Sequence, residues 1–143
     1  MKISTKGRYA VRMMCYIAEQ DSDRAVPIKE IAENQSISLK YLEQIAILLV
    51  KAGYIKSVRG AQGGYRLTRS PDEYTVGMIL RLTEGNIAPV ACLEDEENQC
   101  ERSCQCQTLF IWQRVYDAVC DVVDNITITD IIEHGKKESD TKQ

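Results

Sequence analysis

The sequence predicts a mainly helical fold with one two-stranded hairpin near its middle. Apolar residues recur at helical spacing through most of the chain. The period changes between residues 53 and 68, where two short strand-like segments, 54–59 and 65–68, flank a glycine-rich turn. Three helices followed by a hairpin is the element order of a winged helix-turn-helix domain, and we predict this fold. A long C-terminal helix follows, which we expect to serve in dimerisation.

Local signals place the first two helices. Apolar and small side chains line one face of residues 4–20, and Ser4 or Thr5 is suited to cap this helix. Pro27 is tolerated in the first turn of a helix, so a short second helix begins there. Residues 34–37 form the tight break that ends it.

The third helix extends from its N-cap Ser38 to about Ala52, and Gly53 supplies the stop. Its predicted inward face consists of Leu39, Leu42, Ile45, Ala46 and Leu49. Its predicted outward face consists of Lys40, Tyr41, Glu43, Gln44 and Lys51.

A helix-turn-helix sets the N-terminal part of its second helix in the major groove of DNA. The candidate contacts here are Ser38, Lys40, Tyr41, Glu43 and Gln44. Glutamine pairs with adenine, serine and tyrosine reach bases or phosphate, and lysine adds charge. Glu43 is an anion on a face that should meet phosphate. It either accepts a hydrogen bond from cytosine, deters binding to most sequences, or is an ordinary solvated glutamate.

The hairpin is the predicted wing. Its candidate DNA-binding residues are Arg59, Gly60, Gln62, Gly63 and Gly64. A glycine-rich tip lets backbone approach a groove wall, and a nearby arginine suits a narrow minor groove. An ordinary hairpin turn is the alternative. A phosphate-binding P-loop is excluded, because no Lys-Ser/Thr pair follows the glycines.

Charge divides the chain into two halves. Residues 1–70 hold 12 Lys and Arg against 6 Asp and Glu, whereas residues 71–143 hold 6 against 15. The first half therefore carries about +6 and the second −9, within a net charge of −3. This division favours a polyanion as the partner of the first half.

A further amphipathic helix, residues 75–85, completes the predicted DNA-binding domain 1–85. We expect a cysteine-rich loop over 86–107, then a long helix and a short last helix within 108–135. Residues 136–143 read as a flexible polar tail.

Apolar side chains of the long helix recur with spacings of 3, 4, 3, 4 and 3 residues, the rhythm of a helix that packs on a partner helix. They are Leu109, Trp112, Tyr116, Val119, Val123 and Ile126. We predict a homodimer seam there, with packing inside one chain as the alternative.

Cys92, Cys100, Cys104 and Cys106 fall within fifteen residues. No secretory signal or membrane span precedes them, so we expect a cytoplasmic protein whose clustered thiols bind metal or sense redox state. Their spacing leaves an iron–sulfur cluster, zinc and redox thiols open. Neighbouring acidic residues should raise the pKa of these thiols. Two further cysteines, Cys15 and Cys120, lie in apolar helical patterns and read as small buried hydrophobes.

The segments MKISTKGRYAV, ISLKYLEQI and SVRGAQGGY resemble the IscR family of iron–sulfur cluster regulators, which includes NsrR and CymR. The cysteine loop that leads into a Trp-bearing helix, followed by DNIT, matches the same family. The similarity covers residues 1 to about 133.

The resemblance implies a homodimeric transcriptional regulator, most simply a repressor of iron–sulfur cluster biogenesis genes, and not an enzyme. Its partner would be double-stranded operator DNA. The resemblance implies neither binding to a membrane nor a small-molecule substrate. Cys92, Cys100 and Cys106 match the cluster ligands, and the cofactor implied is a [2Fe-2S] cluster. The alternatives are a cluster-free repressor that responds to thiol oxidation or to a partner, a nitric-oxide sensor with a cluster, and a zinc-stabilised repressor.

The chain departs from the family pattern at the fourth ligand. IscR has a histidine where this chain has Leu109, and NsrR-like members have an N-terminal acid where it has Arg8. The first gap between cysteines is also two residues longer than in IscR. Cys104 is the candidate replacement, with an oxygen ligand or a residue of the other subunit as alternatives.

Overall fold

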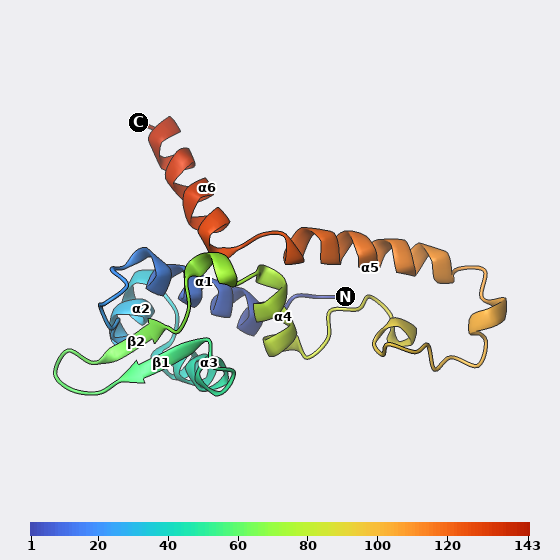
Figure 1. Ribbon diagram of the computed structural model, residues 1–143, viewed down its shortest axis with the longest axis horizontal. Helices are drawn as coiled ribbons and strands as arrows, with labels where there is room; N and C mark the ends of the chain where they lie inside the picture. The colour runs from blue at the N-terminus through green and yellow to red at the C-terminus, as the bar shows by residue number, and fades with distance from the viewer.

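The computed structural model describes residues 1–143 as a helical body from which two C-terminal helices project (Figure 1). The α-helices are α1 Thr5–Glu19, α2 Ile28–Gln35, α3 Leu39–Lys51, α4 Val76–Glu84, α5 Leu109–Asp124 and α6 Ile128–Thr141. The strands are β1 Ile55–Val58 and β2 Gly64–Leu67, and three short 3₁₀ turns complete the structure, η1 Pro71–Glu73, η2 Ala91–Leu93 and η3 Ser103–Gln105. The mainly helical winged fold is confirmed. No helix is both long and apolar enough to cross a membrane.

The predicted caps hold α1 and α3 in place. The Ser4 hydroxyl accepts a hydrogen bond from the Gly7 amide at 3.1 Å, and the Ser38 hydroxyl accepts one from the Tyr41 amide at 3.2 Å. Ser36 adopts a left-handed conformation with φ 52° and forms the turn between α2 and α3. Gly53 follows α3 with φ 77°, a conformation that glycine adopts without strain.

The core lies where α1, α3 and α4 meet the hairpin and the start of α6. Its largest fully buried side chains are Tyr74, Met13, Met14, Ile31, Leu42, Ile45, Leu49, Ile55, Ile79, Ile128 and Val26. The Tyr74 hydroxyl donates to the Tyr54 carbonyl at 2.8 Å and accepts from the Arg69 amide at 3.0 Å, so its burial leaves no unpaired polar atom.

The hairpin is antiparallel, with Ile55 opposite Leu67 and Val58 opposite Gly64. Within its second strand, Tyr65 exchanges two backbone hydrogen bonds of 2.9 Å with Val26, which ties the wing to the segment just before α2. A Cβ on Gly64 would lie 2.3 Å from the Val26 backbone. Only glycine fits at this contact.

The C-terminal part differs from the prediction in one respect. The last helix was expected to be short and to end at about His134, but α6 continues to Thr141 and includes most of the expected polar tail 136–143. Gly135 inside it costs only about 1 kcal/mol relative to alanine. Thr127 caps α6 in a capping box with Asp130, and hydrogen bonds from Ser139 to Gly135 and from Thr141 to Lys137 support its later turns.

Candidate DNA-binding surface and cysteine loop

The α3 helix presents one buried and one exposed face. Leu42, Ile45, Ala46 and Leu49 are buried, as predicted, and Leu39 is half-buried. Lys40, Glu43, Gln44 and Lys51 are exposed on the opposite face. The outward set predicted for the recognition helix therefore lies on one free surface, with one exception.

The exception is Tyr41, which was predicted to lie outside. Its ring is half-buried edge-to-face against Tyr9, with ring centroids 5.7 Å apart and an interplanar angle of 75°. An aromatic ring gains more from this packing than from water. The Ser38 side chain also has a structural role, because its oxygen caps α3. Its hydroxyl proton remains free to donate a hydrogen bond.

The wing residues separate into two groups. Arg59, Gly60 and Gln62 are exposed at the tip, where Gly60 takes φ 114°. Gly63 and Gly64 are half-buried, and a Cβ on either would collide with backbone of the same chain. Backbone packing within the chain thus gives both glycines a structural role, and their contact with DNA stays a prediction.

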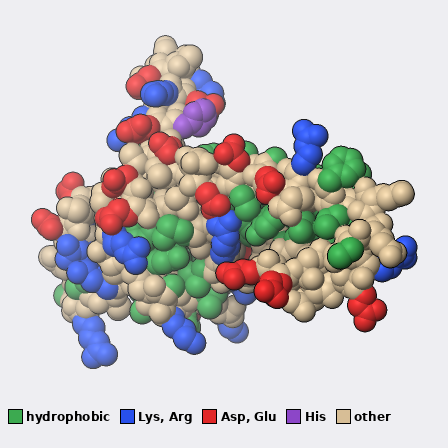
Figure 2. All heavy atoms as spheres, turned by 45° about the vertical axis from the view of Figure 1, so that its right-hand side comes forward, with side chains coloured by type: hydrophobic (Ala, Val, Ile, Leu, Met, Phe, Trp, Pro, Cys, Tyr) green, Lys and Arg blue, Asp and Glu red, His purple; other side chains and the backbone are tan.

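Basic side chains gather on the side of the body that carries the helix and the wing. Figure 2 shows Lys and Arg side chains projecting along the lower edge, where Figure 1 places the hairpin and α3. Such a surface attracts a polyanion over a distance of about one Debye length, roughly 8–10 Å in physiological salt.

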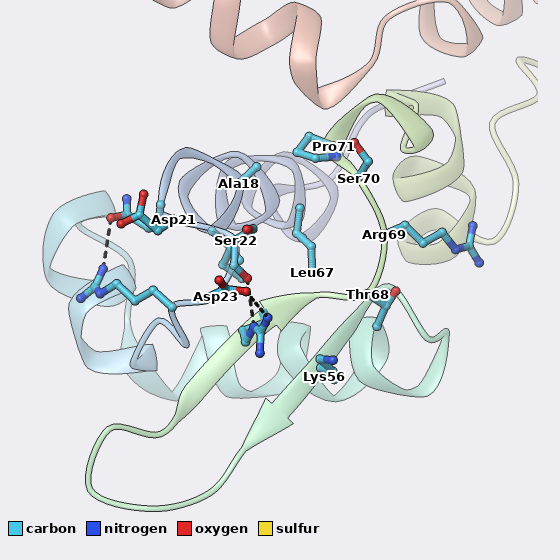
Figure 3. A pocket seen from close by; sticks show the side chains of 14 residues that line it. Ala18, Asp21, Ser22, Asp23, Lys56, Leu67, Thr68, Arg69, Ser70 and Pro71 are labelled. Carbon is cyan, nitrogen blue, oxygen red and sulfur yellow. Dashed lines mark hydrogen bonds and ion pairs between the residues drawn. The ribbon is translucent and has the colours of Figure 1, made fainter.

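A cavity of about 470 Å³ separates the hairpin from the end of α1 (Figure 3). Arg66 crosses it: its Nε donates to the Ser22 carbonyl at 3.0 Å, and its Nη2 lies 3.4 Å from the Asp23 carboxylate. These contacts brace the wing against the loop that follows α1. Arg66, on the second strand of the hairpin, thus has a role within the fold.

The cysteine loop lies between α4 and α5 and runs outward beside α5, which then returns toward the body (Figure 1). Cys100, Cys104 and Cys106 are exposed, Cys92 is half-buried, and all are free thiols. Cys92 borders a cavity of about 400 Å³ whose other lining residues include Leu109, Gln113 and Tyr116 of α5. No three His, Cys, Asp or Glu side chains of the chain are gathered closely enough to hold a metal ion.

Cys106 lies just before α5. A hydrogen bond between its Sγ and the Thr108 hydroxyl at 3.5 Å, together with the Thr108 and Leu109 amides and the charge of Arg102, lowers the pKa of this thiol. The expectation that neighbouring acids would raise the pKa of the loop thiols is therefore wrong for Cys106. Hydrogen bonds to the thiolate and the positive end of a helix outweigh the more distant carboxylates.

The two isolated cysteines lie among helices, as expected, but both are half-buried rather than buried. Cys15 packs against the core, and burial raises its pKa to about 12. Cys120 lies on α5, and its Sγ accepts a hydrogen bond from Arg81 of α4 at 3.5 Å. Arg81 also binds Asp124 through two hydrogen bonds of 2.5 and 2.9 Å, and the positive guanidinium lowers the pKa of Asp124.

The α5 helix has no buried residue. Two members of the predicted seam, Leu109 and Tyr116, line the cavity beside the chain's own cysteine loop. Val119 and Val123 are half-buried, while Trp112 and Ile126 are exposed. The outward apolar stripe also includes Ile111, Val115 and Val122. The free apolar face is thus rotated partly away from the predicted seam, because the loop covers one flank of the helix.

Comparison with known proteins assigns the family. The model of the Rrf2 family, described as an iron-dependent transcriptional regulator, matches residues 3–134. The chain is 41% identical to the HTH-type transcriptional regulator CymR of Bacillus subtilis, covering 98% of this chain and 96% of CymR. It is 37% identical to the HTH-type transcriptional regulator IscR of Aliivibrio salmonicida, covering 92% and 77%.

A solved structure agrees with this assignment. The structure of CymR (YrzC), the global cysteine regulator of B. subtilis, superposes with a TM-score of 0.77 at 42% identity, covering 94% of this chain and 98% of that one. Fold, sequence and site geometry lead to one conclusion: the chain belongs to the Rrf2 family of DNA-binding transcriptional regulators.

Proposed function

We propose that this protein is a homodimeric repressor that binds operator DNA through α3 and the wing and responds to an iron–sulfur cluster on the cysteine loop. The observation that carries the DNA-binding part is the single exposed face of α3, with Lys40, Gln44 and Lys51, beside a basic wing. Paired helices in successive major grooves require two subunits, so operator recognition and dimerisation go together.

The projecting α5 helix supports the dimer. Its outward side chains include an apolar stripe, in which Val122 is 56% and Ile111 is 40% exposed. Pairing two such helices removes both stripes from water, at about 25 cal/mol for each Å² of apolar surface. The two DNA-binding bodies then lie at opposite ends of one assembly.

The donor chemistry of the loop fits a cluster. Cys92, Cys100 and Cys106 are the thiols that would hold it, and all three lie on the segment between α4 and α5, whose regular structure is limited to two short 3₁₀ turns. Cys104 is the proposed fourth ligand, since Leu109 occupies the position of the family histidine. When bound, the cluster would supply a redox-sensitive centre, and its loss or oxidation would change the conformation of the loop. Cys92 of the loop and Leu109, Gln113 and Tyr116 of α5 line one cavity. A change in the conformation of the loop is transmitted across this cavity to α5, the helix that forms the dimer.

A second candidate is a repressor of the same fold without a cluster, serving cysteine metabolism. Three observations favour it: the absent histidine at Leu109, the ungathered thiols, and the likeness to a global cysteine regulator. In this form the lowered pKa of Cys106 makes its thiolate the one most open to oxidation.

Anaerobic purification and reconstitution with iron and sulfide separates the two candidates. We expect a visible chromophore with iron and acid-labile sulfide, lost in each of Cys92→Ala, Cys100→Ala and Cys106→Ala. Cys120→Ala is the matched control, because this thiol lies on α5 outside the loop. Cys104→Ala tests the fourth ligand. A colourless protein that still binds its operator would favour the cluster-free repressor, and one with stoichiometric zinc would favour a zinc site.

A further inference from the structure

The outward face of α3 carries two exposed apolar side chains, Ile47 and Val50, among polar ones. Ile47 is 66% exposed, the highest exposure of any large hydrophobic residue of the chain. Single exposed hydrophobes are common on protein surfaces and need no explanation by themselves. The position of Ile47 on α3 is what points to a function.

Ile47 lies one helical turn beyond Glu43 and Gln44, on the same face of α3. Lys40 and Lys51 lie on this face at either side of it, eleven residues apart in sequence. At 1.5 Å rise per residue their Cα atoms are about 16 Å apart along the helix axis. The major groove is about 12 Å wide, so lysines at this separation suit phosphates on its opposite walls. The side chains between them then lie over base edges.

A shallow hollow continues this surface toward the wing. It has a volume of about 380 Å³ and is lined by Ile47, Val50, Lys51, Ser57 and Tyr65. Part of its wall is therefore apolar on the side of the molecule that would meet DNA. The carbon atoms of Ile47 offer no hydrogen bond, so they suit only an apolar group of a base. In the major groove of unmodified DNA that group is the 5-methyl of thymine.

We propose that Ile47 is a specificity-determining residue that contacts a thymine methyl group in each operator half-site. This inference rests on the proposed DNA-binding function and names one element of the sequence that it selects. Glu43 and Gln44 recognise hydrogen-bonding groups on the bases, and Ile47, one turn further along the helix, recognises an apolar group.

The test removes single methyl groups from DNA. The full-length protein first selects a duplex from a random library, and each thymine of that duplex is then replaced by deoxyuridine, which lacks only the methyl. We expect one position per half-site at which this replacement weakens binding about four-fold, the change that about 0.8 kcal/mol for one buried carbon group produces. In Ile47→Ala the same replacement should have no further effect.

Lys51→Ala is the matched control on the same helix face. It should weaken binding equally on the thymine and uracil duplexes, because a phosphate contact is independent of the base. Methyl dependence that persists in Ile47→Ala, or no methyl dependence in the wild type, would overturn this inference and leave the proposed function intact. Failure to select any duplex would overturn both. Ile47→Ala should keep the wild-type Tm, since the side chain lies outside the core.

Discussion

Substitution of Val122 by glutamate should dissociate the proposed dimer without unfolding the protomer. Val122 is 56% exposed in the protomer, and full burial of a valine contributes about 1.5–3 kcal/mol. About half of that remains to be gained at the interface, so two protomers lose about 2 kcal/mol together. Two unpaired carboxylates at the seam add at least a further 2 kcal/mol. A total of about 4 kcal/mol raises the dimer Kd about a thousandfold.

Sedimentation over a range of protein concentrations measures this change, and circular dichroism checks that the variant keeps its helix content. Gln113→Glu is the control, because Gln113 lies nine residues earlier on α5, which is two and a half turns and the opposite face. It adds the same charge beside the cysteine loop and should leave the dimer intact. If Val122→Glu remains dimeric at micromolar concentration, the outward stripe of α5 is not the interface.

Four further predictions follow from single contacts. Arg59→Ala should reduce the slope of log K against log[salt] by about 0.9 if this side chain meets a phosphate; an unchanged slope and affinity would remove the wing tip from the interface. Gly64→Ala should lower the free energy of unfolding by more than about 2 kcal/mol, because its Cβ would overlap the Val26 backbone, whereas Gly135→Ala, which meets nothing within 4 Å, should raise it by about 1 kcal/mol in denaturant titrations. With its pKa raised to about 12, Cys15 should react with iodoacetamide at least about tenfold more slowly in the native protein than in the denatured chain, and equal rates would contradict its burial. Glu43→Ala should let cluster-free protein bind duplexes that the wild type rejects, with a uniform loss across a duplex panel as the contrary result.

Short-range signals predicted most elements of the fold. The caps Ser4 and Ser38 and the stop Gly53 act within a few residues of where they stand, so the sequence alone locates the helix ends they mark. The two strands agree with their predicted limits to within one residue. The end of α6 was missed, because a glycine followed by polar residues reads as a helix stop although Lys136, Lys137 and Glu138 are good helix formers.

The candidate DNA-binding site was predictable in type and less so in detail. The outward face of α3 follows from its 3.6-residue period, which identified Lys40, Glu43 and Gln44. Ile47 escaped notice because an isoleucine inside an apolar run reads as core until the helix faces are resolved. Tyr41 and Gly64 were assigned to DNA, whereas packing against Tyr9 and Val26 explains each within the chain.

The sequence by itself determined the family, the order of helices and hairpin, the basic half of the chain and the loop that carries four cysteines. These properties depend on residue identity, on spacing and on bonds between near neighbours. Only the tertiary structure decided which face of α5 remains free, that Arg66 braces the wing, and that Cys106 has a lowered pKa. Each of these depends on which groups meet in space, and burial, electrostatic fields and hydrogen bonds act over distances that the order of residues does not specify.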